Sequence, residues 1–155
     1  TDIEWKLAGK LRRKHGYVSN EIVAAGMGFE DTRDALFEVM GLKQKPLTQA
    51  EVIDAANAGD PVALEFCRLR ARTVMTAMGN MALVANATGG VFIAGGVSQR
   101  LEPWLKERAA LDRFYVRWPR TELMKPIPVN LIASEAAPLI GSAHLWRDEQ
   151  MRGWL

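Results

Sequence analysis

The sequence predicts one α/β domain that is rich in helices and contains a small sheet. Several segments place apolar residues at helical spacing, and the longest runs from about Pro61 to about Ala87. Two short apolar runs, Gly90–Ala94 and Ile127–Ala133, contain β-branched residues and read as buried strands of a parallel or mixed sheet. A chain of 155 residues suits a single domain with its own core.

The first helix is expected over Glu4–Lys14. Its apolar residues Trp5, Leu7, Ala8 and Leu11 lie near one face, and Gly16 ends it. Ser19 then begins a short helix through Val23 and Ala24, because serine is a favoured N-cap.

Glycines and caps mark the next boundaries. The Gly-rich segment Ala25–Phe29 predicts a turn, after which a helix begins at Asp31 or Thr32 and ends at Gly41. Thr48 and Glu51 have the spacing of a capping box, which predicts another helix start.

The long central helix starts with Asp60 as N-cap and Pro61 at its first position. Its apolar residues surround much of its circumference, so we expect it to be largely buried. After the first strand we expect a helix over Pro103–Ala110 and an irregular aromatic stretch over Asp112–Pro119. The second strand is followed by an amphipathic helix over Pro138–Arg147.

Composition narrows the class of protein. The apolar fraction is 48%, the charged fraction is 25% and the net charge is only +2, as in ordinary globular domains. A net charge this close to zero does not indicate binding to nucleic acid or to an anionic membrane. No apolar run approaches the roughly 20 residues that cross a bilayer. The lone cysteine, Cys67, allows no intrachain disulfide and reads as a small buried residue.

Two glycine turns are candidate ligand contacts. Gly95 and Gly96 follow the first strand, and the carboxyl ends of such strands are where nucleotides tend to bind. Gly26 and Gly28 precede a helix, where backbone N–H groups can meet a phosphate. The residues alone leave the alternative open that both segments are simply tight turns.

Glu21 lies four residues before Ala25. An ionised carboxylate accepts hydrogen bonds and could bind sugar hydroxyls, although a helix-capping or surface role is the alternative. His15 and His144 lie far apart in sequence without a cysteine or acid at ligand spacing, so no metal site is predicted.

Three segments together resemble bacterial glucokinases, which are actin-like, ATP-dependent sugar kinases with two lobes. They occur in the family's order and spacing, and with the intervening helix the resemblance covers nearly the whole chain. These segments are HGYVSNEIVAAGMG (15–28), GGVFIAGGVS (89–98) and IPVNLIASEAAPLIG (127–141).

The resemblance implies a role for each matching residue. Glu21 corresponds to the family glutamate that contacts glucose, and Gly26 and Gly28 to the turn beside the nucleotide phosphates. Gly95 and Gly96 correspond to the adenosine motif. Gly141 corresponds to the glycine where the last helix packs back on the lobe. The family turn usually starts with serine, whereas this chain has Ala25 and so lacks that hydroxyl.

The resemblance also implies a fold and a context. Residues 1–155 would form the C-terminal, ribonuclease-H-like lobe of a cytoplasmic, homodimeric glucokinase that uses ATP with Mg²⁺. The chain starts at Thr1, within a helical pattern, which suggests a fragment. The N-terminal lobe, with the catalytic aspartate, would be absent, so no catalytic residue is assigned here. The alternative is a non-catalytic sugar-sensing or dimerisation module of a kinase-derived transcription regulator.

Overall fold

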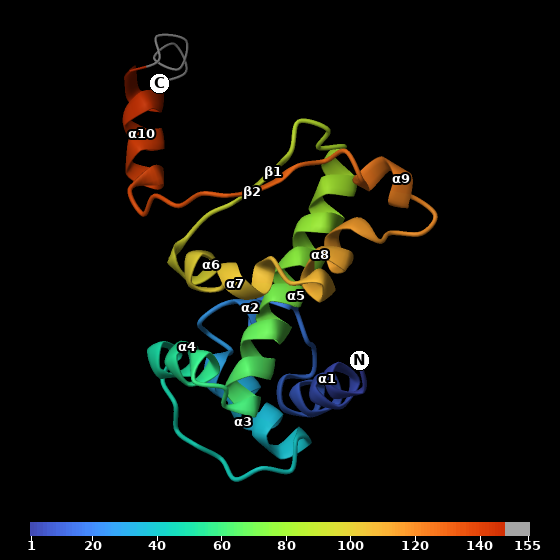
Figure 1. The fold of residues 1–155 in the computed structure, drawn as a ribbon, viewed down its shortest axis with the longest axis vertical. Coiled ribbons are helices and arrows are strands. Elements are labelled where there is room, and N and C mark those ends of the chain that lie inside the picture. The colour runs from blue at the N-terminus through green and yellow to red at the C-terminus, as the bar shows by residue number, and fades with distance from the viewer. Residues whose placement is uncertain (148–155) are drawn as a thin grey trace.

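The computed structural model describes residues 1–147 and confirms a helix-rich α/β fold with a small parallel sheet. Figure 1 shows helices gathered around the long helix α5, with the sheet and the last helix beyond one end of this group. The first five helices are α1 (Asp2–His15), α2 (Asn20–Ala24), α3 (Phe29–Val39), α4 (Gln49–Asn57) and α5 (Pro61–Ala85). They are followed by β1 (Val91–Ile93), α6 (Gly96–Arg100), α7 (Glu102–Leu105), α8 (Arg108–Tyr115), α9 (Thr121–Met124), β2 (Val129–Leu131) and α10 (Ala137–Arg147).

The predicted caps at α4 and α5 are confirmed. Thr48 Oγ1 accepts from Glu51 N at 3.3 Å, and the Glu51 carboxylate accepts from Thr48 N at 2.8 Å. Asp60 Oδ1 accepts from the backbone N–H groups of Val62 and Ala63 at 3.0 and 3.1 Å. These bonds satisfy donors that the first turn of a helix leaves unpaired, so α4 and α5 begin where the local sequence predicts.

The core is built around α5. Its buried residues face α2, α4 and α8, and Phe66 and Cys67 are 2% and 0% exposed. Burial raises the pKa of the Cys67 thiol to about 12, so Cys67 behaves as a small apolar residue, as predicted. The far end of α5 is different, because Met81 and Val84 are 60% and 84% exposed. The expectation of a largely buried helix therefore holds only for the part nearer Pro61.

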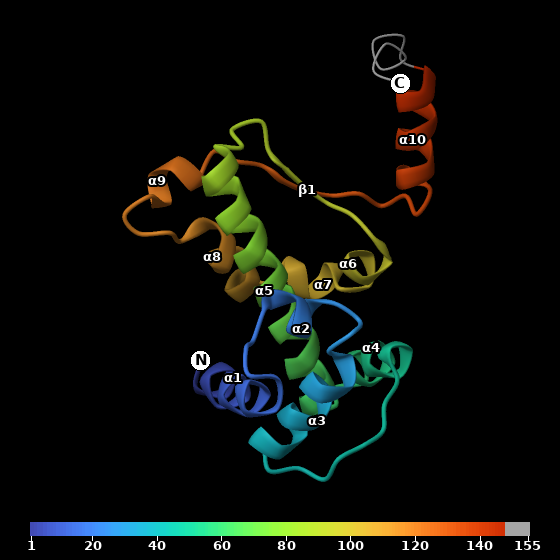
Figure 2. The same ribbon diagram turned by 180° about the vertical axis from the view of Figure 1, so that it is seen from behind.

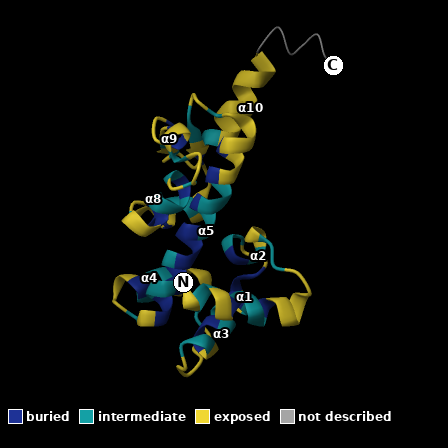
Figure 3. Ribbon diagram, turned by 90° about the vertical axis from the view of Figure 1, so that its right-hand side faces the viewer, coloured by how far each residue is buried: buried dark blue, intermediate teal, exposed yellow. Residues whose placement is uncertain are grey.

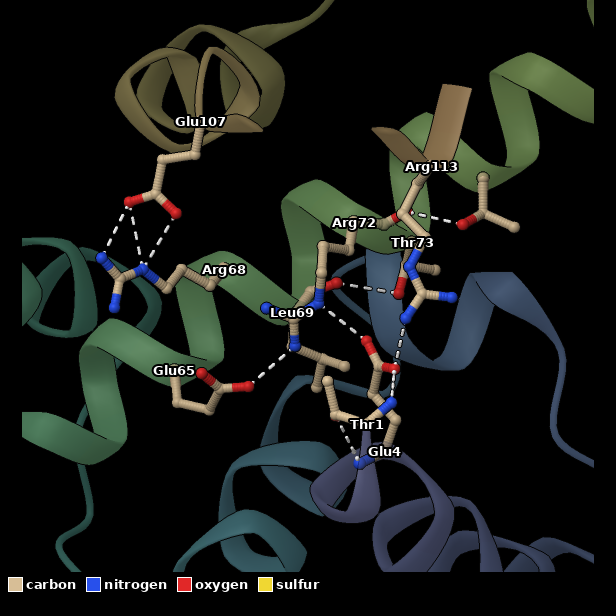
Figure 4. Close-up of polar contacts among 10 residues, drawn as sticks. Thr1, Glu4, Glu65, Arg68, Leu69, Arg72, Thr73, Glu107 and Arg113 are labelled. Carbon is tan, nitrogen blue, oxygen red and sulfur yellow. Dashed lines mark hydrogen bonds and ion pairs between the residues drawn. The ribbon is translucent and has the colours of Figure 1, made fainter. Parts of the chain in front are cut away.

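An ion-pair network joins α1, α5 and α8 (Figure 4). Arg72, which is 7% exposed, donates to Glu4 and to Glu65, both at 2.7 Å. Arg113 of α8 donates to the same Glu4 carboxylate at 2.5 Å. Burial opposes ionisation of Glu4, but in residues 1–155, where Thr1 has a free amine, hydrogen bonds from this amine and from Arg72 outweigh it and lower the Glu4 pKa to about 2. The network therefore fixes α1 against α5 with ionised groups.

The sheet has two parallel strands, in which Val91, Phe92 and Ile93 are opposite Val129, Asn130 and Leu131. Ile93 is buried toward the helices, whereas Phe92 on the other face is 65% exposed. Parallel sheets are usually covered on both faces. Within residues 1–147 this sheet is covered on one face only. In the same range, neither strand pairs with a further strand on its outer edge.

Three local predictions were wrong. Helix α3 begins at Phe29, before Asp31. The helix predicted over Pro103–Ala110 is divided between α7 and α8, and α8 extends into the stretch predicted to be irregular. Ala110 and Phe114 explain this extension, because they lie one helical turn apart and are both buried.

The last helix, α10, was expected to be amphipathic and to pack on the lobe at Gly141. It contains no buried residue, and a Cβ added at Gly141 would meet no atom within 4 Å. It lies apart from the helices around α5 in Figure 1 and Figure 2, and Figure 3 shows it exposed along its length. That expectation was therefore wrong for the described chain. Trp5 of α1, expected on an apolar face, is also 80% exposed.

Candidate functional site

The first glycine turn, Ala25–Gly28, joins α2 to α3 and brings the backbones of the two helices into close contact. A Cβ at Gly28 would lie 2.0 Å from the Ile22 carbonyl oxygen, so only glycine fits there without movement of the backbone. The same carbonyl accepts a hydrogen bond from Thr32 Oγ1 at 3.2 Å, and Thr32 is fully buried. Gly28 is therefore required for α2 and α3 to pack as they do.

This turn leaves backbone donors available. Gly28 is the N-cap residue of α3, and no side chain caps that helix. None of the hydrogen bonds within residues 1–147 uses the backbone N–H of Gly26, Met27 or Gly28. Unpaired N–H groups at the positive end of a helix dipole favour an anion such as phosphate.

Asp31, in the first turn of α3, directs its charge toward α1. It pairs with Lys14, and its Oδ2 lies 2.8 Å from His15 Nε2. The hydrogen bond from Lys14 is the main cause that holds the Asp31 pKa below its usual value. This carboxylate is engaged by the Lys14 ammonium and by the His15 ring, which reduces its repulsion of an anion at the turn.

The second glycine turn follows β1. Gly95 has φ of 105°, a conformation that side chains rarely adopt, and it caps α6. A Cβ at Gly95 or Gly96 would meet no atom within 4 Å, and both residues are exposed. The backbone at the carboxyl end of β1 is therefore open to a ligand.

The first glycine turn lies beside a small cavity that is lined by Gln49 and by residues of α5 and α6, but no glycine of either turn lines it. A Cβ at Gly26 would lie 3.1 Å from Gln49 Nε2, so Gln49 is the side chain beside the first turn. Gln49 lines a cavity of about 20 Å³ together with Arg70 of α5, and Val97 and Arg100 of α6. Such a volume has room for about one water molecule.

Gln49, Arg70 and Arg100 were not among the residues predicted to form the site. The sequence feature that could have indicated these residues is Arg70, a charged residue one helical turn after Phe66 in a mostly apolar helix.

Glu21 lies in the first turn of α2, exposed, and does not line this cavity. Within residues 1–147 its carboxylate takes part in none of the hydrogen bonds or ion pairs, while its backbone oxygen accepts from Ala25 N at 2.8 Å. Glu21 is thus one helical turn before the first glycine turn, with its acceptor oxygens available.

Larger hollows lie elsewhere. A groove of about 180 Å³ between α1, α2 and α5 is lined by Glu4, Arg72 and Arg113, and one of about 380 Å³ lies between α1 and α3. Neither contains a residue of the glycine turns. Over residues 1–147, no three His, Cys, Asp or Glu side chains come together as metal ligands. In the same range no helix is long and apolar enough to cross a bilayer.

Known proteins match this chain along almost its whole length. The family model for glucokinase matches residues 1–149. The glucokinase of Allorhizobium ampelinum is 33% identical over 92% of the chain, and that of Mesorhizobium japonicum is 30% identical over 99%. A crystal structure of glucokinase from an Antarctic psychrotroph has a TM-score of 0.82 and 33% identity over 92% of the chain.

The chain spans 42% and 45% of the length of the two curated relatives, and 45% of the solved chain. The region of the relatives that it matches is their C-terminal part. Nothing among these relatives favours the transcription-regulator alternative. Because the family model covers all but the last six residues, this chain belongs to the glucokinase family.

Proposed function

We propose that the intact protein phosphorylates glucose at its 6-hydroxyl with ATP, and that residues 1–155 are its C-terminal lobe. The observation that carries this proposal is the match of residues 1–149 to the glucokinase family, and the two glycine turns of this chain support it. The second turn has exposed backbone and the first has unpaired backbone N–H groups, and neither depends on a reactive side chain. That suits phosphoryl transfer, in which an enzyme acts mainly by positioning the reactants and stabilising charge.

The turn at Gly26 and Gly28 would hold the ATP phosphates. Its unpaired N–H groups and the start of α3 supply donors, which compensates for the hydroxyl missing at Ala25. Gly95 and Gly96 would lie against the nucleoside, where the absence of a Cβ permits close approach.

Glu21 would bind glucose. Its exposed carboxylate has acceptor oxygens available for sugar hydroxyls, and it lies one helical turn from the phosphate-side turn. The group that removes the proton from the 6-hydroxyl would come from outside this chain. We therefore expect residues 1–155 alone to have no glucokinase activity.

Mg²⁺ is the metal ion that a kinase of this family implies. It prefers octahedral oxygen ligands and usually binds through phosphates, waters and one or two carboxylates. Within residues 1–147 no three His, Cys, Asp or Glu side chains come together. We therefore assign the ion mainly to the ATP phosphates, to water and to acids outside this chain.

A coupled assay that detects glucose 6-phosphate tests the proposal. The intact protein should phosphorylate glucose with ATP, while residues 1–155 should show no turnover. Calorimetry on residues 1–155 should detect weak ATP binding and no glucose binding. Intact protein that binds ATP but leaves glucose unphosphorylated would contradict the proposal, and so would full activity of the isolated chain.

We further propose a cytoplasmic homodimer. ATP is available in the cytoplasm, and large apolar side chains are exposed around the far end of α5 and near α9, including Met81, Val84, Trp118 and Leu123. Such clusters of exposed apolar residues are typical of protein–protein contacts. Light scattering on the intact protein tests the dimer, because a monomer mass at high concentration would contradict it.

A further inference from the structure

Arg70 is buried in an unusual way. It is 5% exposed, and within residues 1–147 it pairs with no carboxylate. Its Nη2 donates instead to the Ala24 carbonyl at 2.5 Å, and its Nε has no hydrogen-bond partner. Burying a cation without an acidic partner is unfavourable. The charge of Arg72, two residues further along the same helix, is instead neutralised, because Arg72 pairs with Glu4 and Glu65 (Figure 4).

The Arg70 contact lies at the entrance of the first glycine turn. Ala24 is the last residue of α2, and its carbonyl is among those that the end of a helix leaves unpaired. Because Arg70 is on α5, this bond ties the start of the turn to the most buried helix of the protein.

A second contact from α5 lies at the exit of the same turn. Phe66 packs edge-on against Phe29, the first residue of α3, with ring centroids 5.2 Å apart. The Arg70 guanidinium lies 5.6 Å from the centroid of the Phe66 ring. Residues 66 and 70 are one helical turn apart, so they share one face of α5. This face contacts both ends of Ala25–Gly28.

The unneutralised charge also suits the role proposed for the turn. Arg70 and Arg100 both line the cavity beside Gly26 and Gln49, and no carboxylate lines it. Two guanidinium groups near the turn favour an anionic ligand there. Burial lowers the pKa of the Arg70 guanidinium, because desolvation disfavours its charged form.

We propose that Arg70 is a positioning residue for the ATP-side turn Ala25–Gly28, acting through its hydrogen bond to Ala24 and its contact with Phe66. This inference rests on the proposed kinase function. Arg70 itself need not touch ATP, because its effect passes through the backbone donors of the turn.

The test uses the intact protein with Arg70→Met, which keeps the length of the side chain and removes its charge and donors. The KM for ATP should rise about tenfold, the size expected for losing a hydrogen bond from a charged donor. The KM for glucose should stay within about twofold, since Glu21 is not held by Arg70. Arg70→Lys should restore part of the ATP affinity.

Two control variants separate positioning from stability. Arg68→Met makes the same chemical change two residues away, where Arg68 binds Glu107 and not the turn. Arg72→Met removes a buried arginine from the ion-pair network and should lower the unfolding midpoint. Neither should change the KM for ATP. Equal increases in the KM for ATP and for glucose in Arg70→Met, or no increase in either, would overturn the proposal.

Hydrogen–deuterium exchange provides a readout that does not depend on activity. The hydrogen-bonded amides of Phe29 and Thr32, at the exit of the turn, should exchange faster in Arg70→Met than in Arg68→Met. Unchanged exchange of these amides overturns the positioning role even if the enzyme is active. Intact protein without any glucokinase activity, but with faster exchange in Arg70→Met, instead overturns the proposed function and leaves the structural contact supported.

Discussion

Two regions of this molecule differ in how completely they bury their apolar side chains. The helical body, which comprises α1–α5, α7 and α8, encloses residues such as Leu11, Phe66 and Phe114 at 2% exposure or less. The outer region, which comprises β1, α6, α9, β2 and α10, leaves Phe92 65% and Leu139 74% exposed. Apart from the exposed far end of α5, the core of the body is enclosed within residues 1–147. We expect the outer region to be covered by the rest of the intact protein, since relatives are more than twice as long.

The largest effect should come from emptying the core of the helical body. Phe66→Ala removes a ring that packs on Phe29, and it should cost about 3–5 kcal/mol of unfolding free energy. The matched change in the outer region, Phe92→Ala, should cost less than about 0.5 kcal/mol in residues 1–155. Urea denaturation measures both. Similar losses for the two variants would remove the distinction between the regions.

A smaller effect should follow from filling the close contact at the first turn. Gly28→Ala places a methyl group 2.0 Å from the Ile22 oxygen, which should cost about 2 kcal/mol as α2 and α3 separate. Gly96→Ala, in the outer region, meets no atom within 4 Å and should leave stability nearly unchanged. Thermal unfolding followed by circular dichroism compares them, and an equally stable Gly28→Ala would show that the turn can relax.

The next effect depends on pH. In residues 1–155 the folded-state pKa of Glu4 is about 2, below its ordinary value of 4.5, so ionised Glu4 stabilises the fold above about pH 4.5. This contribution is lost as pH falls from 4.5 toward 2. Glu4→Gln should therefore cost about 1–2 kcal/mol at pH 7, after allowance for partial exposure, and less at pH 3.

Glu122 of α9 serves as the control for Glu4. Its side chain is 80% exposed and pairs only with Lys125, so Glu122→Gln should change stability little at either pH. Urea midpoints at pH 7 and pH 3 provide the comparison. A cost for Glu4→Gln that is the same at both pH values would contradict the depressed pKa.

The smallest effect in this chain should be on α10. Leu139→Ser should change the stability of residues 1–155 by less than about 0.5 kcal/mol, because the side chain is 74% exposed. In the intact protein the same substitution should cost about 2 kcal/mol if the rest of the protein buries it. Chemical denaturation of both proteins decides this, and equal small effects would mean that α10 stays exposed.

Local signals explain which parts of the fold were predictable. The boxes and caps at Thr48, Glu51 and Asp60 depend on residues two or three positions apart, so the sequence is sufficient to place the starts of α4 and α5. The first strand was marked by an apolar run with β-branched residues between glycines, and the second by the apolar run Ile127–Ala133. The extension of α8 beyond Ala110 was missed because Ala110 and Phe114 are buried by contact with distant α5, and this contact is not visible in the local pattern.

The glycine turns of the candidate site were predictable from the sequence, whereas the residues that hold the first turn in place were not. A positive φ at Gly95 and the close approach at Gly28 each leave a mark in the sequence, because other residues do not fit. The bond from Arg70 to Ala24 joins residues 46 positions apart. Its existence follows from how α2 packs on α5, and a helical pattern with arginines at positions 68, 70 and 72 does not specify which of them binds Ala24.

The open sheet has a consequence for the chain when it is alone in solution. On their outer edges, β1 and β2 present backbone N–H and C=O groups that no strand within residues 1–147 pairs with. Unprotected strand edges beside exposed apolar side chains are templates for aggregation. At high concentration, residues 1–155 should therefore self-associate through cross-strand pairing between copies, a hazard that a neighbouring strand on each edge would remove.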